Sequence, residues 1–434
     1  MVDKIPYRFL LGVLTFMFAT RVSIQFALQF WNPGFFPNFD LWHSNTMPYS
    51  KLLTIQCVFI AVMLAGILYN PRQYPKIALT LMCLGWLYVT VMVARLIIGT
   101  FEISAHSWFD GAVSTAFHFG LAAYILVFGA SLRSISQEGT KRSMPVVQYC
   151  AYPSLLIVAY LLFVWLVDTG APQLFSAYLT VMIAAISILF HETFLPSRED
   201  WRPTAKEIIR DGLFLTLVQV ALPAVLKGLA LVLIVWMSNN STAPIIGIWP
   251  SDAPILVQVA IMLVVAEFFR YWMHRTFHKN RILWKLHAVH HAADKLYTIN
   301  VGRFHPLDKS LQFLGDTLPF LLLGVSPDVF AAYFVLYAIN GFYQHSNADV
   351  RLGFLNWIIA GPELHRWHHS AIISEAHSNY GNNLILWDSI FGTRHLPKGQ
   401  QVCRVGIGNT DWPEDFLGQM SAPFTTSTEV SNKE

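Results

Sequence analysis

Long apolar stretches, each long enough to form a membrane-spanning helix, constrain this chain more than any other feature of its sequence. A helix needs roughly 20 apolar residues to cross the hydrocarbon core of a bilayer. Only 13% of the 434 residues are charged and 54% are hydrophobic, whereas soluble domains carry about 25% charged residues. The sequence therefore predicts an all-α, polytopic transmembrane bundle. We expect about eight spans, at residues 9–30, 52–69, 77–100, 111–132, 147–167, 174–194, 212–237 and 254–272.

The segments between these stretches alternate in basic charge, which predicts their orientation. Lys and Arg precede the first stretch and recur in residues 70–76, 133–146 and 195–211, but residues 32–50, 101–110, 168–173 and 238–253 contain neither. Cytoplasmic loops of membrane proteins are the ones enriched in Lys and Arg. We therefore expect the N-terminus, and after eight crossings the segment from Tyr271 onward, in the cytosol. The net charge of +3 is too small to indicate a nucleic-acid partner.

Histidines concentrate in the segments that follow the eighth stretch. They form one HxxxH motif and two HxxHH motifs, made by His274 and His278, by His287, His290 and His291, and by His365, His368 and His369. Residues four apart share one face of a helix, and neutral imidazole is a common ligand of iron, zinc, copper and nickel. Eight imidazoles exceed the four that a single tetrahedral zinc ion uses. The pattern therefore predicts two metal ions.

Two shorter apolar stretches, residues 311–325 and 328–344, separate the second and third motifs. Each is marginal for a full crossing, and Gly324, Ser326 and Pro327 indicate a turn between them. We expect a short hairpin that dips into the membrane and returns to the cytosolic side. The QHSN segment that follows would then supply His345 as a ninth nitrogen ligand and Asn347 as a polar partner.

Other polar residues near the motifs are candidates for supporting the ligands. Glu267 lies two helical turns before His274, so it is expected either to hydrogen-bond a ligating imidazole or to pair with Arg270. His305 precedes Pro306, which favours a loop or the start of a helix. Residues 377–393 mix aromatic and turn residues, and we expect them to form a cytosolic cap that includes Asp388.

The three histidine motifs in this order, with RFHP, QHSN and NYGNNLILWDSIFGT around them, resemble the fatty acid hydroxylase/sterol desaturase superfamily over about residues 205–395. The resemblance implies a non-haem centre of two iron ions that activates O2 at the cytosolic end of a helical bundle. It implies no catalytic residue separate from the metal ligands, which it assigns to His274, His278, His287, His290, His291, His345, His365, His368 and His369. His377 stands where the family more often has an acidic residue, and we treat it as a supporting residue.

The function predicted from these features is that of a membrane-bound di-iron oxygenase that hydroxylates or desaturates a lipid, sterol or fatty-acyl substrate with O2. The sequence contains no HPGG-type haem motif, GxGxxG motif or cysteine cluster. Electrons are therefore expected from a separate cytochrome b5, ferredoxin or NAD(P)H-dependent reductase. One alternative is a zinc-dependent lipid hydrolase, although the HxxxH motif lacks the glutamate of HExxH. A metal transporter or redox-inactive scaffold would favour ligands in the middle of a span.

The positions of the apolar stretches and of the histidine motifs predict how the chain divides into domains. Residues 1–195 are expected to form an N-terminal transmembrane module of about six spans with no catalytic signal, and residues 196–400 the catalytic domain. Residues 401–434 are polar and expected to be a disordered tail. We expect the protein in a bacterial inner membrane, or in the endoplasmic reticulum if the source is eukaryotic.

Overall fold

The computed structural model describes residues 5–31, 33–42, 47–68, 74–100, 112–132, 145–240, 248–408 and 412–425. Within these residues the fold is helical, with only isolated β-bridges, so the predicted all-α class is confirmed. Among the described residues, eight helices are long and apolar enough to cross a membrane. They cover Tyr7–Ala27, Tyr49–Leu68, Lys76–Gly99, Val113–Leu132, Val147–Asp168, Gln173–Phe194, Ala205–Trp236 and Ile255–Lys279. Residues 101–110, residues 133–144 of the basic segment 133–146, and residues 241–247 of the predicted outer segment 238–253 lie outside the described residues.

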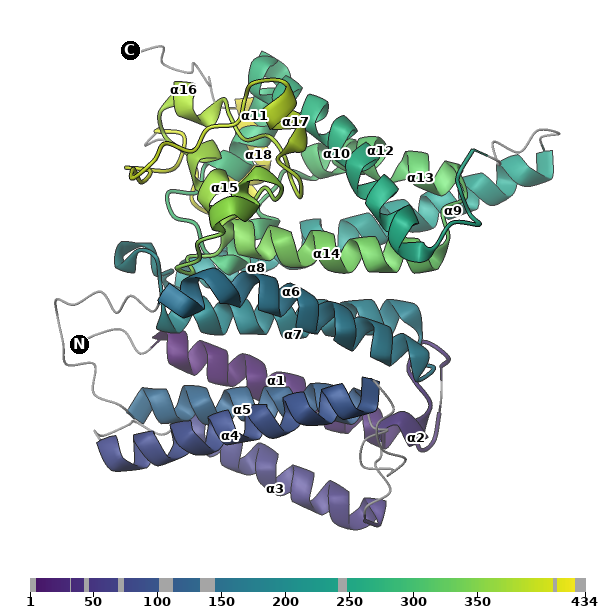
Figure 1. Ribbon diagram of the computed structural model, residues 1–434, viewed down its shortest axis with the longest axis vertical. Helices are drawn as coiled ribbons and strands as arrows, with labels where there is room; N and C mark the ends of the chain where they lie inside the picture. Colours follow the sequence, from purple (N-terminus) through teal and green to yellow (C-terminus); the bar gives the residue numbers. More distant parts are fainter. Residues whose placement is uncertain are drawn as a thin grey trace. The chain divides into compact units, whose positions relative to one another are not determined.

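The chain divides into two compact units, of which the first contains Met1–Met144 and Pro153–Leu195. Its helices are α1 (Ile5–Ala27), α2 (Phe39–Trp42), α3 (Tyr49–Leu68), α4 (Pro75–Thr100), α5 (Ala112–Leu132), most of α6 (Pro145–Asp168) and α7 (Gln173–Phe194). Helices α4 and α5 lie side by side, and α1 packs against α3 and α5 (Figure 1). Apolar side chains from these helices surround Trp42, which is completely buried.

Buried polar side chains connect α1, α2 and α3 inside the first unit. The backbone carbonyl of Trp42 accepts hydrogen bonds from Arg21 Nη2 at 3.3 Å and from Gln25 Nε2 at 3.0 Å. Gln25 Oε1 in turn accepts from Gln56 Nε2 at 3.2 Å. These bonds satisfy polar groups that would be costly to bury alone, and they fix the short α2 against α1.

The second unit contains Pro145–Tyr152 and Pro196–Glu434. After the first turns of α6, it continues with η1 (Glu199–Trp201) and a long helix in three parts, α8 (Ala205–Leu213), the π-helical η2 (Phe214–Ala221) and α9 (Leu222–Asn240). Thr204 starts this helix through a capping box with Glu207. The remaining elements are α10 (Ile255–Lys279), α11 (Arg281–His291), η3 (Thr298–Gly302), α12 (Pro306–Asp316), α13 (Leu318–Leu322), α14 (Pro327–His345), η4 (Gly353–Trp357), α15 (Pro362–His368), α16 (Ile373–Ala376), α17 (Leu386–Ile390) and α18 (Phe416–Thr425).

The short hairpin predicted between the second and third histidine motifs is formed by α12, α13 and α14. Gly324 turns the chain with a positive φ of 75°, a conformation that glycine adopts without strain. Ser326 caps α14 through its side chain, which accepts from the backbone N–H of Val329, and Pro327 occupies the first helical turn. Helix α14 then ends at His345.

The expectation of a disordered tail from residue 401 is wrong for the described part of that segment. Helix α18 packs against α11, and its Gln419 and Ala422 are almost completely buried. Phe416 and Met420 pack in the same apolar cluster as Val289 of α11. This short helix is stabilised by its tertiary partner, which the polar composition around it does not reveal. Residues 426–434 lie outside the described residues.

Candidate metal centre

The nine histidines predicted as ligands come from four helices of the second unit. Helix α10 carries His274 and His278 near its C-terminal end, and α11 carries the HxxHH motif of residues 287–291. His345 is the last residue of α14, and the second HxxHH motif forms the end of α15 and its C-cap. All nine side chains are buried.

The structure brings these nine side chains together in two groups. In each group, one nitrogen from every imidazole lies within 4.8 Å of the others. The first group contains five residues, His274, His278, His287, His291 and His368. The second contains four, His290, His345, His365 and His369. The groups adjoin, because the rings of His291 and His369 stack with their centroids 4.4 Å apart. His345, which belongs to neither repeated motif, thus lies among the other candidates.

Most of these imidazoles are oriented by an oxygen acceptor at Nδ1. In the first group, the acceptors are the Tyr380 carbonyl for His274, the Asp308 carboxylate for His287 and the Ser378 carbonyl for His368, each at 2.8 Å. In the second group, the Arg303 carbonyl accepts from His290 at 3.1 Å and Asn300 Oδ1 faces His345 Nδ1 at 3.0 Å. An Nδ1–H that is used in this way leaves the lone pair on Nε2.

The Nε2 atoms converge inside each group. His274 Nε2 lies 3.0 Å from His287 Nε2, and His365 Nε2 lies 3.0 Å from His345 Nε2 and 3.1 Å from His369 Nε2. Two neutral nitrogens that both present lone pairs repel each other at this distance. Nitrogens that share one metal ion at about 2.0–2.1 Å lie roughly 3 Å apart. The donor set therefore fits a transition-metal ion in each group.

Burial also favours the neutral form of the imidazoles that a metal requires. Loss of hydration lowers the pKa of His345 and of His368 to about 3. The same cause, reinforced by neighbouring histidines, holds the pKa of His291 and His369 well below the usual range. In addition, the Nε2 atoms of His291 and His368 are buried without a hydrogen-bond partner. A metal ion would satisfy these nitrogens. Metal binding requires neutral imidazole, which is the form that burial favours.

Two polar residues that sequence reasoning missed contact the histidines directly. Asp308, on the first turn of α12, is fully buried and bonds both His287 and the Gln312 side chain. Asn300, in η3, contacts His345 and also accepts from the backbone N–H of Tyr297. Carboxylate–histidine pairs of this kind commonly orient metal ligands. The only signal in the sequence was their place near the RFHP segment, which by itself does not distinguish them from surface residues.

Glu267 and Asp388 support the centre through a loop and form no hydrogen bond to an imidazole in the described structure. Glu267 accepts from the backbone N–H groups of Asn382 and Asn383 at 2.9 and 2.7 Å. Asp388 accepts from those of Tyr380 and Gly381 at 2.8 and 2.7 Å. The alternative ion pair between Glu267 and Arg270 does not form, because Arg270 pairs with Asp316 at 2.9 Å. The two carboxylates thus hold the loop whose Tyr380 carbonyl orients His274.

The other predicted supporting residues belong to neither group. The Asn347 amide bonds the backbone N–H and carbonyl of Arg198, so it joins α14 to the segment before α8. His305 caps α12 by accepting from the backbone N–H of Leu307. His377 is exposed, and its ring centroid lies 5.6 Å from that of His278. His377 therefore lies next to the first group but is not a member of it.

A buried ion-pair network anchors the backbone behind the second group. Asp211 of α8 accepts from Arg210 at 2.8 Å and from Arg303 at 3.2 Å, and it also contacts the Tyr297 hydroxyl. Arg303 is the residue whose carbonyl accepts from His290. Burial lowers the pKa of Arg303, an effect that the Asp211 carboxylate opposes. A buried cation held by a buried anion in this way fixes the position of its own backbone.

Comparison with known proteins agrees with this geometry. The fatty acid hydroxylase family model matches residues 259–393, which contain all nine histidines of the two groups. The match is limited to this part of the chain. The matched residues include most of α10 and continue to the end of α17, so they also contain the loop held by Glu267 and Asp388.

Relatives of this chain come from bacteria, animals and plants. Ornithine lipid hydroxylase OlsE of Rhizobium tropici is 40% identical over 177 residues, which cover 41% of this chain and 53% of that protein. Human alkylglycerol monooxygenase is 31% identical over 147 residues, 33% of this chain and 32% of that protein. A putative Delta(7)-sterol-C5(6)-desaturase from Arabidopsis thaliana is 31% identical over 147 residues, 33% of this chain and 50% of that protein.

The chain thus spans about half or less of the length of these relatives. No solved structure matches it.

Proposed function

We propose that this protein is a membrane-bound, metal-dependent oxygenase that hydroxylates or desaturates a lipid. The observation that carries the proposal is the pair of adjoining, buried, all-histidine groups within the residues that match the fatty acid hydroxylase family model. Imidazole is a ligand that suits iron. The function of this protein as a whole, including its substrate and partners, is part of the proposal.

Two ferrous ions are the cofactors that we propose, one held by each histidine group. When bound, they would supply the activation of O2 that acid–base side chains cannot provide for an unactivated C–H bond. The chain itself holds the ligands in place. Asp308 and Asn300 orient His287 and His345, and the Tyr380 and Ser378 carbonyls orient His274 and His368.

Aromatic side chains enclose the two groups and limit the access of water. Phe304 stacks on the His290 ring at 4.1 Å, Trp284 contacts the His278 ring at 5.1 Å and Tyr380 contacts the His274 ring at 5.6 Å. Exclusion of water protects a strong oxidant from side reactions. These contacts therefore suit an oxidative reaction on an apolar substrate better than a hydrolytic one.

The substrate that we propose is a lipid, sterol or fatty-acyl chain that enters from the bilayer. The names of the relatives support this class, since they refer to ornithine lipid, alkylglycerol and sterols. The electrons would come from a separate cytochrome b5, ferredoxin or NAD(P)H-dependent reductase. The alternation of basic segments supports a cytosolic position for the histidines, in a bacterial inner membrane or in the endoplasmic reticulum of a eukaryote.

We further propose that residues 196–400 perform the chemistry and that residues 1–195 form an accessory transmembrane module. The family match lies wholly within the second region. A zinc-dependent lipid hydrolase, the alternative, needs a carboxylate positioned as a general base. Neither histidine group of the described structure contains a carboxylate, and the Asp308 carboxylate is bonded to His287 Nδ1. Nothing in the geometry therefore favours hydrolysis.

The decisive experiment combines metal analysis with an assay on membrane lipids. We expect two irons per chain and, with O2 and a reductant, a lipid product sixteen mass units heavier by oxygen insertion or two units lighter by desaturation. The reaction should stop without O2 or without reductant. Two zinc ions together with reductant-independent release of a lipid fragment would contradict the proposal. Zinc without hydrolysis would call for reconstitution with Fe2+ before the assay is repeated.

A further inference from the structure

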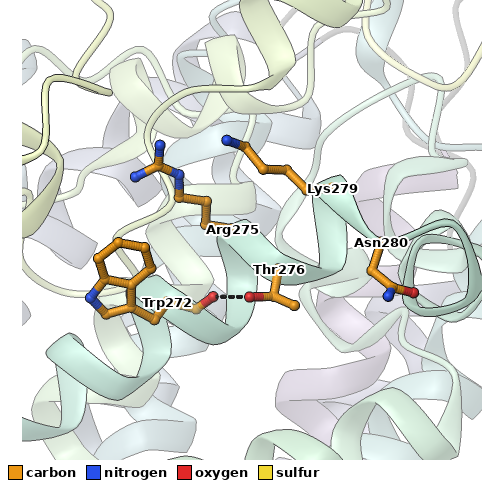
Figure 2. Close-up of a pocket in the computed structure, with 5 residues that line it drawn as sticks. All are labelled: Trp272, Arg275, Thr276, Lys279 and Asn280. Atoms are coloured by element: carbon orange, nitrogen blue, oxygen red, sulfur yellow. Dashed lines mark hydrogen bonds between the residues drawn. The ribbon is translucent and has the colours of Figure 1, made fainter.

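A cationic pocket lies at the C-terminal end of α10 and has no part in the metal groups. It has a volume of about 320 Å³ and is lined by Trp272, Arg275, Thr276, Lys279 and Asn280. Figure 2 shows the side chains of Arg275 and Lys279 extending from the same side of the helix. The spacing of three and four residues from Trp272 to Lys279 places these residues on one helical face. His274 and His278 are buried on another face of the same helix.

The pocket offers hydrogen-bond donors and positive charge. Arg275 Nη1 donates to the Tyr271 hydroxyl at 3.0 Å, and its guanidinium lies 5.3 Å from the centroid of the Trp272 ring. Neither Arg275 nor Lys279 forms an ion pair with an acidic residue in the part of the chain that the structure describes. These two side chains are therefore available to an anion.

Asn280 adds a neutral donor because its amide is oriented by the helix that follows. Its Oδ1 accepts from the backbone N–H groups of Ile282 and Leu283 at 2.9 and 3.1 Å, so it caps the N-terminus of α11. The Nδ2 group is therefore the part of the amide that remains to donate. The pocket adjoins the positive end of the α11 dipole, which also favours an anion.

An exposed apolar stripe leads along α10 to this pocket. Val265, Phe269 and Trp272 are 38%, 46% and 40% exposed, and they follow one another at helical spacing on the same face. Phe391, at the end of α17, contacts the Trp272 ring at 5.0 Å. All of these α10 residues belong to the candidate span Ile255–Lys279. Aromatic side chains near the end of a span, followed by Arg and Lys, are typical of the interface between hydrocarbon and headgroups.

We propose that this pocket binds the phosphate of an anionic phospholipid, whose acyl chains lie along the stripe from Val265 to Trp272. Arg275, Lys279 and the Asn280 amide would bind the phosphate oxygens. The continuity of the stripe with the pocket favours a lipid over free phosphate, because only a lipid occupies both. The lipid would not be the substrate, because the pocket and the buried histidines lie on different faces of α10. Its binding would stabilise the junction of α10 and α11, the two helices that carry five of the nine histidines.

The test uses the full-length protein in nanodiscs of phosphatidylcholine alone or with phosphatidylglycerol. We expect phosphatidylglycerol to raise the thermal unfolding temperature and to be retained in native mass spectra. The double variant Arg275→Gln/Lys279→Gln should lose both effects. A basic residue near a membrane surface contributes about 1 kcal/mol to binding an anionic lipid, so removing two should weaken binding by about 30-fold.

A matched control removes the same charge from a neighbouring surface. Arg281 and Lys285 of α11 do not line the pocket, and neither forms an ion pair among the described residues. The variant Arg281→Gln/Lys285→Gln should therefore keep the phosphatidylglycerol effect. If both double variants lost the phosphatidylglycerol effect to the same extent, the proposal would be overturned, because nonspecific attraction between basic residues and the anionic membrane surface would explain the result. If inorganic phosphate or glycerol phosphate in detergent stabilised the protein as much as phosphatidylglycerol does, the occupant of the pocket would not be a lipid.

Single substitutions keep the test decisive if the double variant does not fold. Lys279 is exposed, so Lys279→Gln should fold and bind phosphatidylglycerol about fivefold more weakly. Lys279→Arg should restore binding. Unchanged retention of phosphatidylglycerol in Lys279→Gln, at full metal content, would remove Lys279 from the site. These readouts do not depend on turnover, so their failure would leave the proposed oxygenase function untouched.

Discussion

Asp308 is the residue outside the histidine groups whose replacement should affect the metal centre most directly. Its two oxygens accept from His287 Nδ1 and Gln312 Nε2, and both bonds are buried. The side-chain amide in Asp308→Asn has one acceptor oxygen and one donor group, whereas His287 Nδ1 and Gln312 Nε2 each need an acceptor. One of these two hydrogen bonds is therefore lost. Substitutions that disturb such orienting partners usually reduce metal affinity or activity 10–100-fold. We expect a loss of that size in Fe2+ titrations.

The control for this variant is Asp252→Asn, a similar substitution at an exposed position before α10. It should bind Fe2+ as the wild type does. Unchanged iron affinity in Asp308→Asn would mean that the packing around His287, rather than the carboxylate, orients the imidazole.

A second prediction at this scale separates the two histidine groups. His368→Ala removes one of the five members of the first group and none of the second, so we expect weaker iron binding in the first group and fewer than two irons per chain after purification. His377→Ala, which changes an exposed histidine beside the first group, should retain both. Iron per chain, measured on purified protein, gives the answer. Full occupancy in His368→Ala, or loss of an ion in His377→Ala, would require a different assignment of the ligands.

At the scale of elements, the contact between η3 and η2 fixes the segment that ends at Arg303. A Cβ on Gly302 would lie 2.5 Å from Leu215 Cα and 2.8 Å from its backbone nitrogen, so an alanine there must displace backbone. Overpacking of this kind costs about 1–3 kcal/mol. We expect Gly302→Ala to lower the unfolding temperature and to reduce iron in the second group, because the Arg303 carbonyl orients His290.

Gly228 of α9 offers the matched control. A Cβ there meets nothing within 4 Å, and alanine is the better helix former by up to about 1 kcal/mol. Gly228→Ala should therefore be neutral or slightly stabilising in the same thermal unfolding experiment. If both glycine variants behaved alike, close packing at Gly302 would not be the cause.

Metal removal is the test that belongs to the whole molecule. Nine buried imidazoles in two groups have their nitrogens directed at one another, so the metal-free chain keeps repulsive and unsatisfied contacts in its second unit. A ligand that binds only the folded state stabilises it by about 2.7 kcal/mol at 100 times its dissociation constant. We expect chelation to lower the unfolding temperature and Fe2+ to restore it. An unchanged unfolding temperature after complete removal of iron would show that packing alone holds the groups together.

The orientation of the chain is a second property of the whole molecule. The proposed topology, which rests on the alternation of basic segments, has Lys285 in the cytosol and Asp252, which precedes α10, on the opposite side. Single cysteines at these positions, in a background without Cys57, Cys83, Cys150 and Cys403, should react with a membrane-impermeant reagent from opposite sides. Labelling of both positions from one side would contradict the proposed topology.

Much of this arrangement could be predicted from sequence because it depends on periodic patterns. Apolar length located the eight candidate spans, and spacing grouped His274 with His278 on one helix. The partners of these histidines depend on contacts between distant segments, which leave no local pattern. The Tyr380 and Ser378 carbonyls carry no side-chain signal at all, and Asp308 lies 21 residues from His287. The same reason explains why α18 was missed, since its stability comes from α11.

The second histidine group also has a consequence for how the protein matures in the cell. His290 and His369, whose Nε2 atoms lie 3.2 Å apart, are separated by 79 positions in the chain. During synthesis, His290 leaves the ribosome long before α15 exists, when all eight candidate spans have already been made. The group can be completed only after the α12–α14 hairpin has folded and brought His345 back. Loading of the proposed iron ions would therefore be among the last steps of biogenesis, and the nascent chain would pass through a stage in which its histidines are accessible to competing metals.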